Sequence, residues 1–283
     1  MTNEQKKQVR DALVRYTANY ATQADASASL KGISATTISQ VKNHNWELMS
    51  ERMWHHIARQ VGFYCGEWQP ADTSAYLLLR ILFADAQHYA MTYGIAMAPG
   101  TGKTFTSAHY TRENDHTFYI AGSELLNRRS FMAALMQSAG LEQKGTLTEM
   151  MDQFTSYLSG LDEPLVILDD AHKLKDRVLH MVVMLTNSLA GSAGVVIMGG
   201  DKLRMRIIDG MRLKKPGYDE IYRSIGRRFI TMTTLAPKDV ELVCHANGVH
   251  NEEMINLIQH DCNSNLHAAT FLIQSYIQHS VAA

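Results

Sequence analysis

The sequence has few cysteines and almost no excess charge, and each shortage narrows the classes of protein to consider. Only three of the 283 residues are cysteines, Cys65, Cys244 and Cys262, and their spacing fits neither a disulfide framework nor a metal site. We therefore expect a reducing, cytoplasmic environment. The net charge of −1 does not by itself indicate a nucleic-acid partner, so local clusters of charge must supply that argument.

Long apolar segments are also missing. No uninterrupted apolar stretch approaches the ~20 residues that a membrane span requires, and the first residues lack the pattern of a secretory signal. We therefore expect no membrane partner. Apolar residues still make up 46% of the chain, which suffices for a packed core, and the length predicts two or three domains.

A glycine-rich segment is the most informative motif. Residues 97–104 read Met-Ala-Pro-Gly-Thr-Gly-Lys-Thr, between a predicted strand at 94–98 and a predicted helix at 103–110. Glycines let backbone N–H groups converge on phosphate oxygens, and the helix N-terminus adds a positive dipole end. We predict that this segment binds ATP rather than forming a simple turn, with Lys103 on the outer phosphates and Thr104 on Mg²⁺. The predicted nucleotide-binding residues are Pro99, Gly100, Thr101, Gly102, Lys103, Thr104 and Phe105.

Two acidic residues form the second motif. The apolar run at 165–168 predicts a buried strand, and Asp169 and Asp170 follow it directly. Ligands bind at the carboxyl ends of strands in open parallel sheets. We predict that Asp169 holds Mg²⁺ beside Thr104 and that Asp170 polarises the attacking water. A solvated strand end is the alternative explanation of the two acids.

Strands and helices alternate after the glycine-rich segment, which is typical of a parallel sheet covered on both faces. An all-helical tail begins at Pro237. The predicted fold class is therefore α/β, with a nucleotide-binding core at 69–235 and a helical lid at 236–283. The predicted strands occupy 94–98, 116–120, 165–168, 194–198 and 229–232, and the predicted helices between them include 124–139, 147–158 and 178–189.

The first 68 residues are predicted to form a separate all-α domain, with a linker at 62–70. Its helical segments include 24–31 and 35–43, separated by a turn at Gly32, which takes a left-handed conformation without a Cβ penalty. This is the spacing of a helix-turn-helix, although a helical bundle with no DNA contact would use the same turn. The residues predicted to contact DNA are Ser34, Thr36, Thr37, Gln40, Lys42 and Asn43.

Basic residues gather between Asp201 and Arg228, where nine basic side chains face four acids, a local excess of +5. Arg223, Arg227 or Arg228 is predicted to act as an arginine finger on the ATP of a neighbouring subunit. Five of the other six basic residues are predicted to face DNA, with a solvated charged surface as the alternative. This DNA-facing group comprises Lys202, Arg204, Arg206, Lys214 and Lys215, and a smaller cluster adds Lys173, Lys175 and Arg177.

In the order of these motifs the chain resembles the phage Mu B family of transposition proteins, AAA+ ATPases that deliver target DNA to transposases. The resemblance rests on the N-terminal helix-turn-helix pattern and on residues 99–104, 166–171, 196–199 and 225–228. It implies an AAA+ fold with a helical lid and ATP-dependent, largely sequence-independent binding of double-stranded DNA. It also implies a homo-oligomer, as a helical filament or ring, and a cognate transposase as partner.

The chain departs from this family's pattern at four places. Met97 replaces the first glycine of the phosphate loop, Asp170 stands where many such ATPases carry glutamate, and Gly200 stands where relatives carry a polar sensor residue. In the tail, residues 263–267 stand where relatives show Gly-x-x-Arg, so His267 is predicted to replace a phosphate-sensing arginine. Because aspartate is shorter than glutamate by about 1.5 Å, we expect weak ATP hydrolysis with nucleotide binding retained.

Two other functions fit the same motifs. One is a helicase loader or replication-initiation ATPase, which a strong preference for one short DNA sequence would favour. The other is a transcription regulator with the ATPase as a sensor, which binding to palindromic half-sites would favour.

Overall fold

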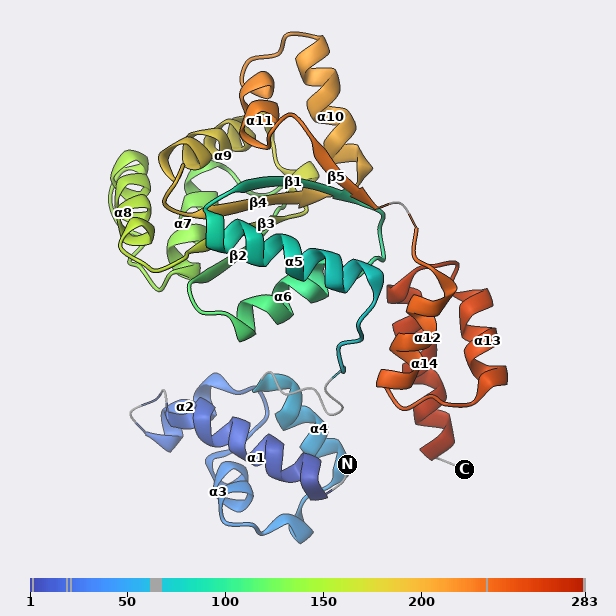
Figure 1. The fold of residues 1–283 in the computed structure, drawn as a ribbon. Helices are drawn as coiled ribbons and strands as arrows, with labels where there is room; N and C mark the ends of the chain where they lie inside the picture. The colour runs from blue at the N-terminus through green and yellow to red at the C-terminus, as the bar shows by residue number, and fades with distance from the viewer. Residues whose placement is uncertain (2, 19, 21, 62–67, 233, 282–283) are drawn as a thin grey trace. The chain divides into compact units, whose positions relative to one another are not determined.

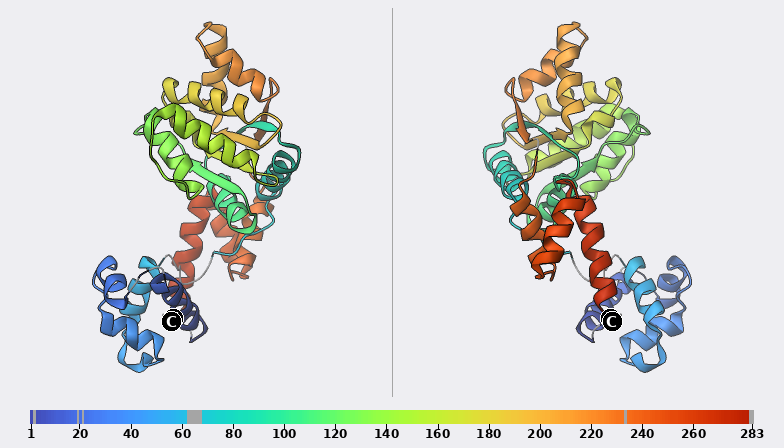
Figure 2. Two further views of the ribbon diagram at one scale, coloured as in Figure 1. Left: turned by 90° about the vertical axis from the view of Figure 1, so that its left-hand side faces the viewer. Right: turned by 90° about the vertical axis from the view of Figure 1, so that its right-hand side faces the viewer.

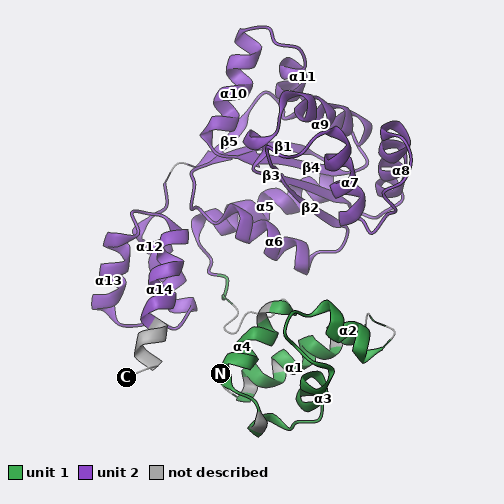
Figure 3. Ribbon diagram, turned by 180° about the vertical axis from the view of Figure 1, so that it is seen from behind, with its two compact units in different colours: residues 1–70 green, residues 71–283 purple. Residues whose placement is uncertain are grey.

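The computed structural model describes the chain except for residues 2, 19, 21, 62–67, 233 and 282–283. It divides the chain into two compact units, Met1–Pro70 and Ala71–Ala283 (Figure 3). Most of the predicted linker at 62–70 lies outside the described residues. Each unit has its own apolar core.

The first unit is all-helical and packs around Leu13, Ile38 and Trp54, which are fully buried. Gly32 has φ +70°, and the Ser34 side chain accepts a hydrogen bond from the Thr37 amide at 3.1 Å, so the turn and the helix cap form as their residue types predict. The elements are α1 (Asn3–Ala18), α2 (Gln23–Ser29), α3 (Ala35–Lys42), the 3-10 turn η1 (Trp46–Leu48) and α4 (Glu51–Gln60).

The second unit is built on a five-stranded sheet whose strand pairs are all parallel, in the order β2-β3-β4-β1-β5 (Figure 1). The predicted fold class is thereby confirmed. Parallel order places the carboxyl ends of β1, β3 and β4 along one edge of the sheet. The strands are β1 (Thr92–Met97), β2 (Thr117–Ala121), β3 (Leu165–Asp169), β4 (Gly194–Gly199) and β5 (Phe229–Met232).

Helices cover both faces of this sheet (Figure 1 and Figure 2). Along β3, Leu165 and Ile167 belong to the core under α5 and α6, whereas Val166 and Leu168 belong to the core under α7 to α11. The alternation follows from the two-residue period of a strand. The helices are α5 (Ser74–Tyr89), α6 (Lys103–Glu113), α7 (Arg128–Ser138), α8 (Leu147–Ser159), the 3-10 turn η2 (Ala171–Lys173), α9 (Asp176–Ser188), α10 (Asp201–Arg212) and α11 (Tyr218–Ser224).

The tail of the second unit contains three helices, α12 (Pro237–Ala246), α13 (Glu252–Asp261) and α14 (Leu266–Val281). Asp239, at the start of α12, is only 2% exposed and accepts hydrogen bonds from the Ser74 amide at 2.7 Å, the Ser74 hydroxyl at 3.0 Å and the Ala236 amide at 2.8 Å. This carboxylate therefore ties the first turn of α12 to the first turn of α5. None of the described helices has the length and apolarity to cross a membrane.

The Asp239 contacts predict the first experiment. Asp239→Ala removes the buried acceptor of three partly buried hydrogen bonds, so we expect the free energy of unfolding of the second unit to fall by roughly 1–3 kcal/mol. Urea denaturation followed by circular dichroism measures this loss. Glu241→Ala, which removes an exposed carboxylate from the same helix, is the control and should change stability by less than about 0.5 kcal/mol. Equal losses in the two variants would contradict the assignment.

Candidate functional site

The glycine-rich segment forms a tight loop between β1 and α6. Gly100 and Gly102 have φ +76° and +91°, values that side chains with a Cβ adopt at a cost. The Thr101 hydroxyl donates to the Ala98 carbonyl at 2.9 Å, which holds the turn. The loop therefore presents its backbone and the N-terminus of α6 to the same place, as an anion site requires.

Lys103 lies inside this loop. It is 8% exposed, and its ammonium donates to the carbonyl oxygens of Met97 at 3.1 Å and Ala98 at 2.8 Å. Burial lowers the pKa of Lys103, whereas the charges of Asp169 and Asp170 raise it. A triphosphate at this loop offers the ammonium anionic oxygens, which are stronger acceptors than the two carbonyls.

The two predicted nucleotide motifs meet in space. The Thr104 hydroxyl donates to Oδ2 of Asp169 at 2.6 Å, and Asp169 is 1% exposed. The second carboxylate oxygen accepts the Asp170 amide at 2.7 Å, which fixes the orientation of the Asp169 side chain. The structure thus brings together the pair that the sequence assigns to Mg²⁺.

These donors fit magnesium. Hydroxyl and carboxylate oxygens are hard ligands, and Mg²⁺ typically uses one or two carboxylates together with phosphate oxygens and waters. Within the described part of the chain no group of three or more His, Cys, Asp or Glu side chains is placed to hold a metal by itself. Thr104 and Asp169 would therefore hold Mg²⁺ together with a nucleotide, and the ion would neutralise phosphate charge.

Asp170, the predicted base, adopts φ +50°, a left-handed conformation that is uncommon for residues other than glycine. Its carboxylate accepts a hydrogen bond from the Lys173 ammonium at 2.6 Å. This contact raises the pKa of Lys173. Lys173, predicted from the sequence to face DNA, is therefore paired with the predicted base.

Tyr119 is a site residue that the sequence analysis missed. Its hydroxyl donates to Oδ2 of Asp169 at 3.3 Å from the neighbouring strand β2. Burial, followed by the charge of Asp169, raises the pKa of Tyr119, so the hydroxyl remains a donor at neutral pH. In the sequence this tyrosine alternates with apolar residues like any strand residue, and only the register of Tyr119 opposite Ile167 shows where it points.

The start of α14 contacts the phosphate loop. The Leu266 amide donates to the Gly100 carbonyl at 2.8 Å, and Oδ1 of Asn265 accepts the His267 amide at 2.9 Å. A Cβ on Gly100 would lie 2.2 Å from this Asn265 oxygen. Asn265 therefore touches the loop, whereas His267 is exposed, and a phosphate-sensing role of His267 remains a prediction.

The three candidate arginine fingers are exposed, as a finger reaching into another subunit must be. Arg223 forms an ion pair with Asp219 at 2.9 Å within α11. Arg227 and Arg228 follow α11 and directly precede β5. Which of them reaches a nucleotide stays a prediction.

Arg206 lies in a different environment from the rest of its predicted DNA-facing group. Its guanidinium pairs with Asp176 and donates to the Leu174 carbonyl at 2.6 Å, so it fastens α10 to the start of α9. Most of its hydrogen-bonding capacity is used within the fold. The other members of the group lie at the surface, with Lys202, Lys214 and Lys215 exposed and Arg204 partly exposed.

The residues predicted to contact DNA in the first unit lie on α3 and its two caps. Ile38 and Val41 on the same helix are fully buried, so the polar face of α3 points away from the core. The residues of this face are exposed or partly exposed: Ser34, Thr36, Thr37, Gln40, Lys42 and Asn43.

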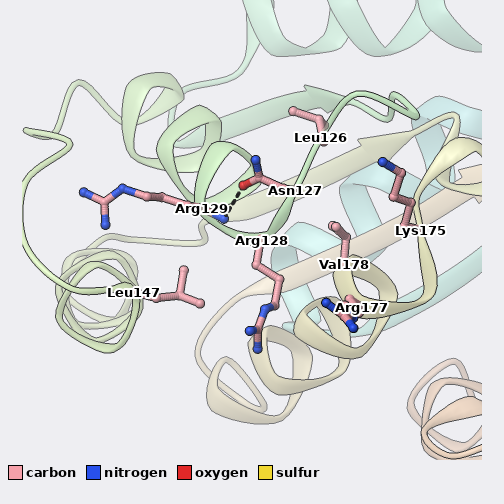
Figure 4. A pocket seen from close by; sticks show the side chains of 8 residues that line it. All are labelled: Leu126, Asn127, Arg128, Arg129, Leu147, Lys175, Arg177 and Val178. Carbon is pink, nitrogen blue, oxygen red and sulfur yellow. Dashed lines mark hydrogen bonds between the residues drawn. The ribbon is translucent and has the colours of Figure 1, made fainter.

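A groove between the starts of α7 and α9 carries four cations, which we call the basic groove: Arg128, Arg129, Lys175 and Arg177 (Figure 4). Its cavity has a volume of about 440 Å³, and an adjoining cavity of about 460 Å³ shares Arg128 and Arg177 as lining residues. The sequence analysis identified Lys175 and Arg177 but missed the two arginines of α7, because 47 residues separate Arg128 from Lys175 in the chain.

Tyr119 supplies the second experiment. Tyr119→Phe removes a donor to Asp169, and loss of such an outer partner weakens metal affinity, here by roughly tenfold. The measurement is the Mg²⁺ concentration that half-saturates binding of a fluorescent ATP analogue. Tyr93→Phe is the matched control, since Tyr93 lies on β1 and its hydroxyl contacts only the Met91 sulfur among its described neighbours, at 3.5 Å. An unchanged Mg²⁺ requirement in Tyr119→Phe would contradict the assignment.

Comparisons with known proteins agree with this geometry. A family model described as "AAA domain" matches residues 95–207, which carry Lys103, Thr104, Asp169 and Asp170. Among solved structures, one of the Drosophila ORC bound to AT-rich DNA and Cdc6 shows 14% identity and a TM-score of 0.41, over 71% of this chain and 39% of that chain. That likeness is too low to carry an argument about function. No curated protein matches the chain. The matched segment contains both nucleotide motifs, which the structure brings into contact, and the protein is an ATPase.

Proposed function

We propose that this protein is an ATP-dependent DNA-binding protein that oligomerises on double-stranded target DNA and activates a transposase. One observation carries the proposal: the nucleotide site and the basic groove share a continuous segment. Asp169 ends β3, Asp170 follows it, and Lys175 and Arg177 come within eight residues of Asp169. A change at the phosphates therefore has a short covalent path to groove cations.

The charge of the basic groove supports a polyanionic ligand. Arg128, Lys175 and Arg177 are exposed and form no ion pair with any residue within the described ranges. Arg129 donates to the Gly145 carbonyl at 3.0 Å, which leaves its charge uncompensated. Four uncompensated cations on two elements suit the closely spaced phosphates of a DNA backbone, which is bound without regard to sequence.

The nucleotide acts as the switch in this proposal. A ligand shifts an equilibrium only by binding one state better, so ATP must favour the DNA-bound oligomer over the free protein. An exposed arginine before β5 would complete the site of a neighbouring subunit. With aspartate at position 170 we expect slow turnover, so that the assembled state persists.

The first unit supports a second contact with DNA. The polar face of α3 has the short side chains and the Ser34 cap of a recognition helix, although only Lys42 adds positive charge. We propose that this face contributes modestly, and that the groove supplies most of the affinity. The transposase partner rests on the resemblance to the Mu B family alone.

Substitution of Lys103 tests whether DNA binding depends on ATP. Lys103→Ala removes the cation that the outer phosphates require, so we expect ATP-dependent retention of duplex DNA on filters to fall at least tenfold, and ATP-dependent assemblies on DNA to vanish in electron micrographs. Lys144→Ala, an exposed lysine before α8, is the control and should behave as the wild-type protein. DNA binding that is the same with and without ATP would refute the switch.

Substitutions in the basic groove test whether this groove binds DNA. We expect the triple variant Arg128→Gln, Lys175→Gln and Arg177→Gln to bind duplex DNA more weakly. The slope of log K against log[salt] should also become shallower, by up to about 3, because three phosphate contacts are lost. ATP binding should be unchanged, because none of the three contacts the phosphate loop.

A matched triple variant at exposed positions elsewhere removes the same charge: Arg112→Gln, Lys144→Gln and Lys238→Gln. Equal losses in both triples would mean that general charge, and not the groove, binds DNA. Strong preference for one short sequence in the wild-type protein would instead favour a helicase loader or replication-initiation ATPase.

A further inference from the structure

A second groove adjoins the basic groove, and its floor is apolar. Its cavity of about 460 Å³ is within the range of pockets that take ligands. Met151 of α8 and Met181 of α9 line it and are 8% and 3% exposed, so they form its floor, whereas Met184 is 61% exposed. We call this the methionine groove, and define it by Leu147, Met151, Met181 and Met184 together with Arg128 and Arg177.

The α9 side of the methionine groove follows one face of a helix. Arg177, Met181, Met184 and Ser188 all line the cavity, at intervals of three or four residues. From Arg177 to Ser188 the helix rises about 16 Å, which is roughly three turns. A helix of three turns from another protein would match this length. Helices that bind in grooves place apolar side chains at the same spacing.

The floor suits a protein ligand better than a nucleic acid. Leu147, Met151 and Met181 offer no strong hydrogen-bond donor to a phosphate or a sugar. Methionine is flexible and polarizable, and it is common on surfaces that accept varied apolar side chains. The exposed side chain of Met184 extends the apolar surface to the rim. A partner with one apolar face would remove this surface from water.

Two arginines set the charge of the partner. Arg128 and Arg177 line both cavities, so they mark the end at which the methionine groove joins the basic groove. Both are exposed, and neither forms an ion pair with any residue in the described ranges. Asp152, by contrast, lines only the methionine groove. Because a guanidinium binds a carboxylate through two parallel hydrogen bonds, the joined end favours acidic residues of a partner.

We propose that the methionine groove binds a short amphipathic helix of a partner protein, apolar on one face and acidic in the turn that meets Arg128 and Arg177. The apolar floor beside two unpaired arginines carries this inference. The same arginines are two of the four cations of the basic groove, so docking withdraws them from DNA. This competition with DNA rests on the proposed function, whereas the docking itself does not.

The test uses full-length protein with isotope-labelled methionine methyl groups, observed by nuclear magnetic resonance. The probe is the synthetic peptide Glu-Glu-Ala-Leu-Gln-Ala-Leu-Leu-Gln-Ala-Leu-Gln, with acids in its first turn and leucines at helical spacing. We expect the methyl signals of Met151, Met181 and Met184 to shift when the peptide is added. The signal of Met205, which is 53% exposed on α10 and does not line the groove, should stay in place.

Two pairs of comparisons identify the contacts. Met184→Gln puts a polar side chain at the exposed rim, so we expect peptide affinity to fall about fivefold. Met205→Gln, the same change at an exposed methionine elsewhere, should leave affinity unchanged. A peptide with glutamine in place of both glutamates should bind the wild-type protein about tenfold more weakly. Arg128→Gln with Arg177→Gln should remove this difference between the two peptides.

Each outcome decides a separate claim. If the peptide at millimolar concentration shifts none of the three groove methyls, or if both peptides bind the wild-type protein equally, the proposed docking is overturned. It is also overturned if duplex DNA shifts these methyls and the peptide does not, because the cavity would then belong to the DNA surface. If the peptide shifts them and leaves duplex binding unchanged, the docking is supported, and the DNA role of Arg128 and Arg177 in the proposed function fails.

Discussion

The hydrogen bond between Thr104 and Asp169 joins two segments that lie 65 residues apart in sequence, and the rest of the site depends on it. It forms because β1 and β3 flank β4 in a parallel sheet, so that their carboxyl ends meet at one edge. Helix α6 starts at Lys103 and turns the Thr104 hydroxyl toward Asp169. The Asp170 amide and the Tyr119 hydroxyl then hold the same carboxylate from two further directions.

Two other parts of the second unit are connected to the Thr104–Asp169 contact. The helical tail contacts the phosphate loop through a hydrogen bond from the Leu266 amide, at the start of α14, to the Gly100 carbonyl. The basic groove reaches the Thr104–Asp169 contact through the segment that leaves β3, where Lys173 pairs with Asp170. A nucleotide bound between Lys103 and Asp169 would alter the partners of both, and this is how the proposed function couples nucleotide state to DNA binding and assembly.

Much of this could be predicted from the sequence, because local patterns carry it. The parallel sheet follows from apolar runs alternating with helical periodicity, and the pairing of Thr104 with Asp169 follows from two motifs at strand ends. Residues 201–224 are different: we predicted a charged segment, and the structure forms α10 and α11 there, with Leu203, Ile207 and Tyr218 buried. The many charged residues of this segment made the helical spacing of its apolar residues hard to recognise in the sequence.

The residues that the sequence did not reveal are those whose roles depend on register or on long-range packing. Tyr119 acts through its position opposite Ile167, Asn265 through the docking of α14 on Gly100, and Arg128 through the approach of α7 to α9. None of these contacts has a local pattern. Arg206 is the opposite case. Its charge suggested that it faces DNA, whereas its contacts with Asp176 and the Leu174 carbonyl give it a role in packing α10 against the start of α9.

The central claim is that Lys103, Thr104 and Asp169 form one triphosphate site, and titration calorimetry with ATP and Mg²⁺ tests it most directly. The account predicts uptake of one ATP per chain, lost when Thr104 and Asp169 are both replaced by alanine in a protein that remains folded. Absence of heat at millimolar ATP in the wild-type protein, or full uptake by the double variant, would contradict it.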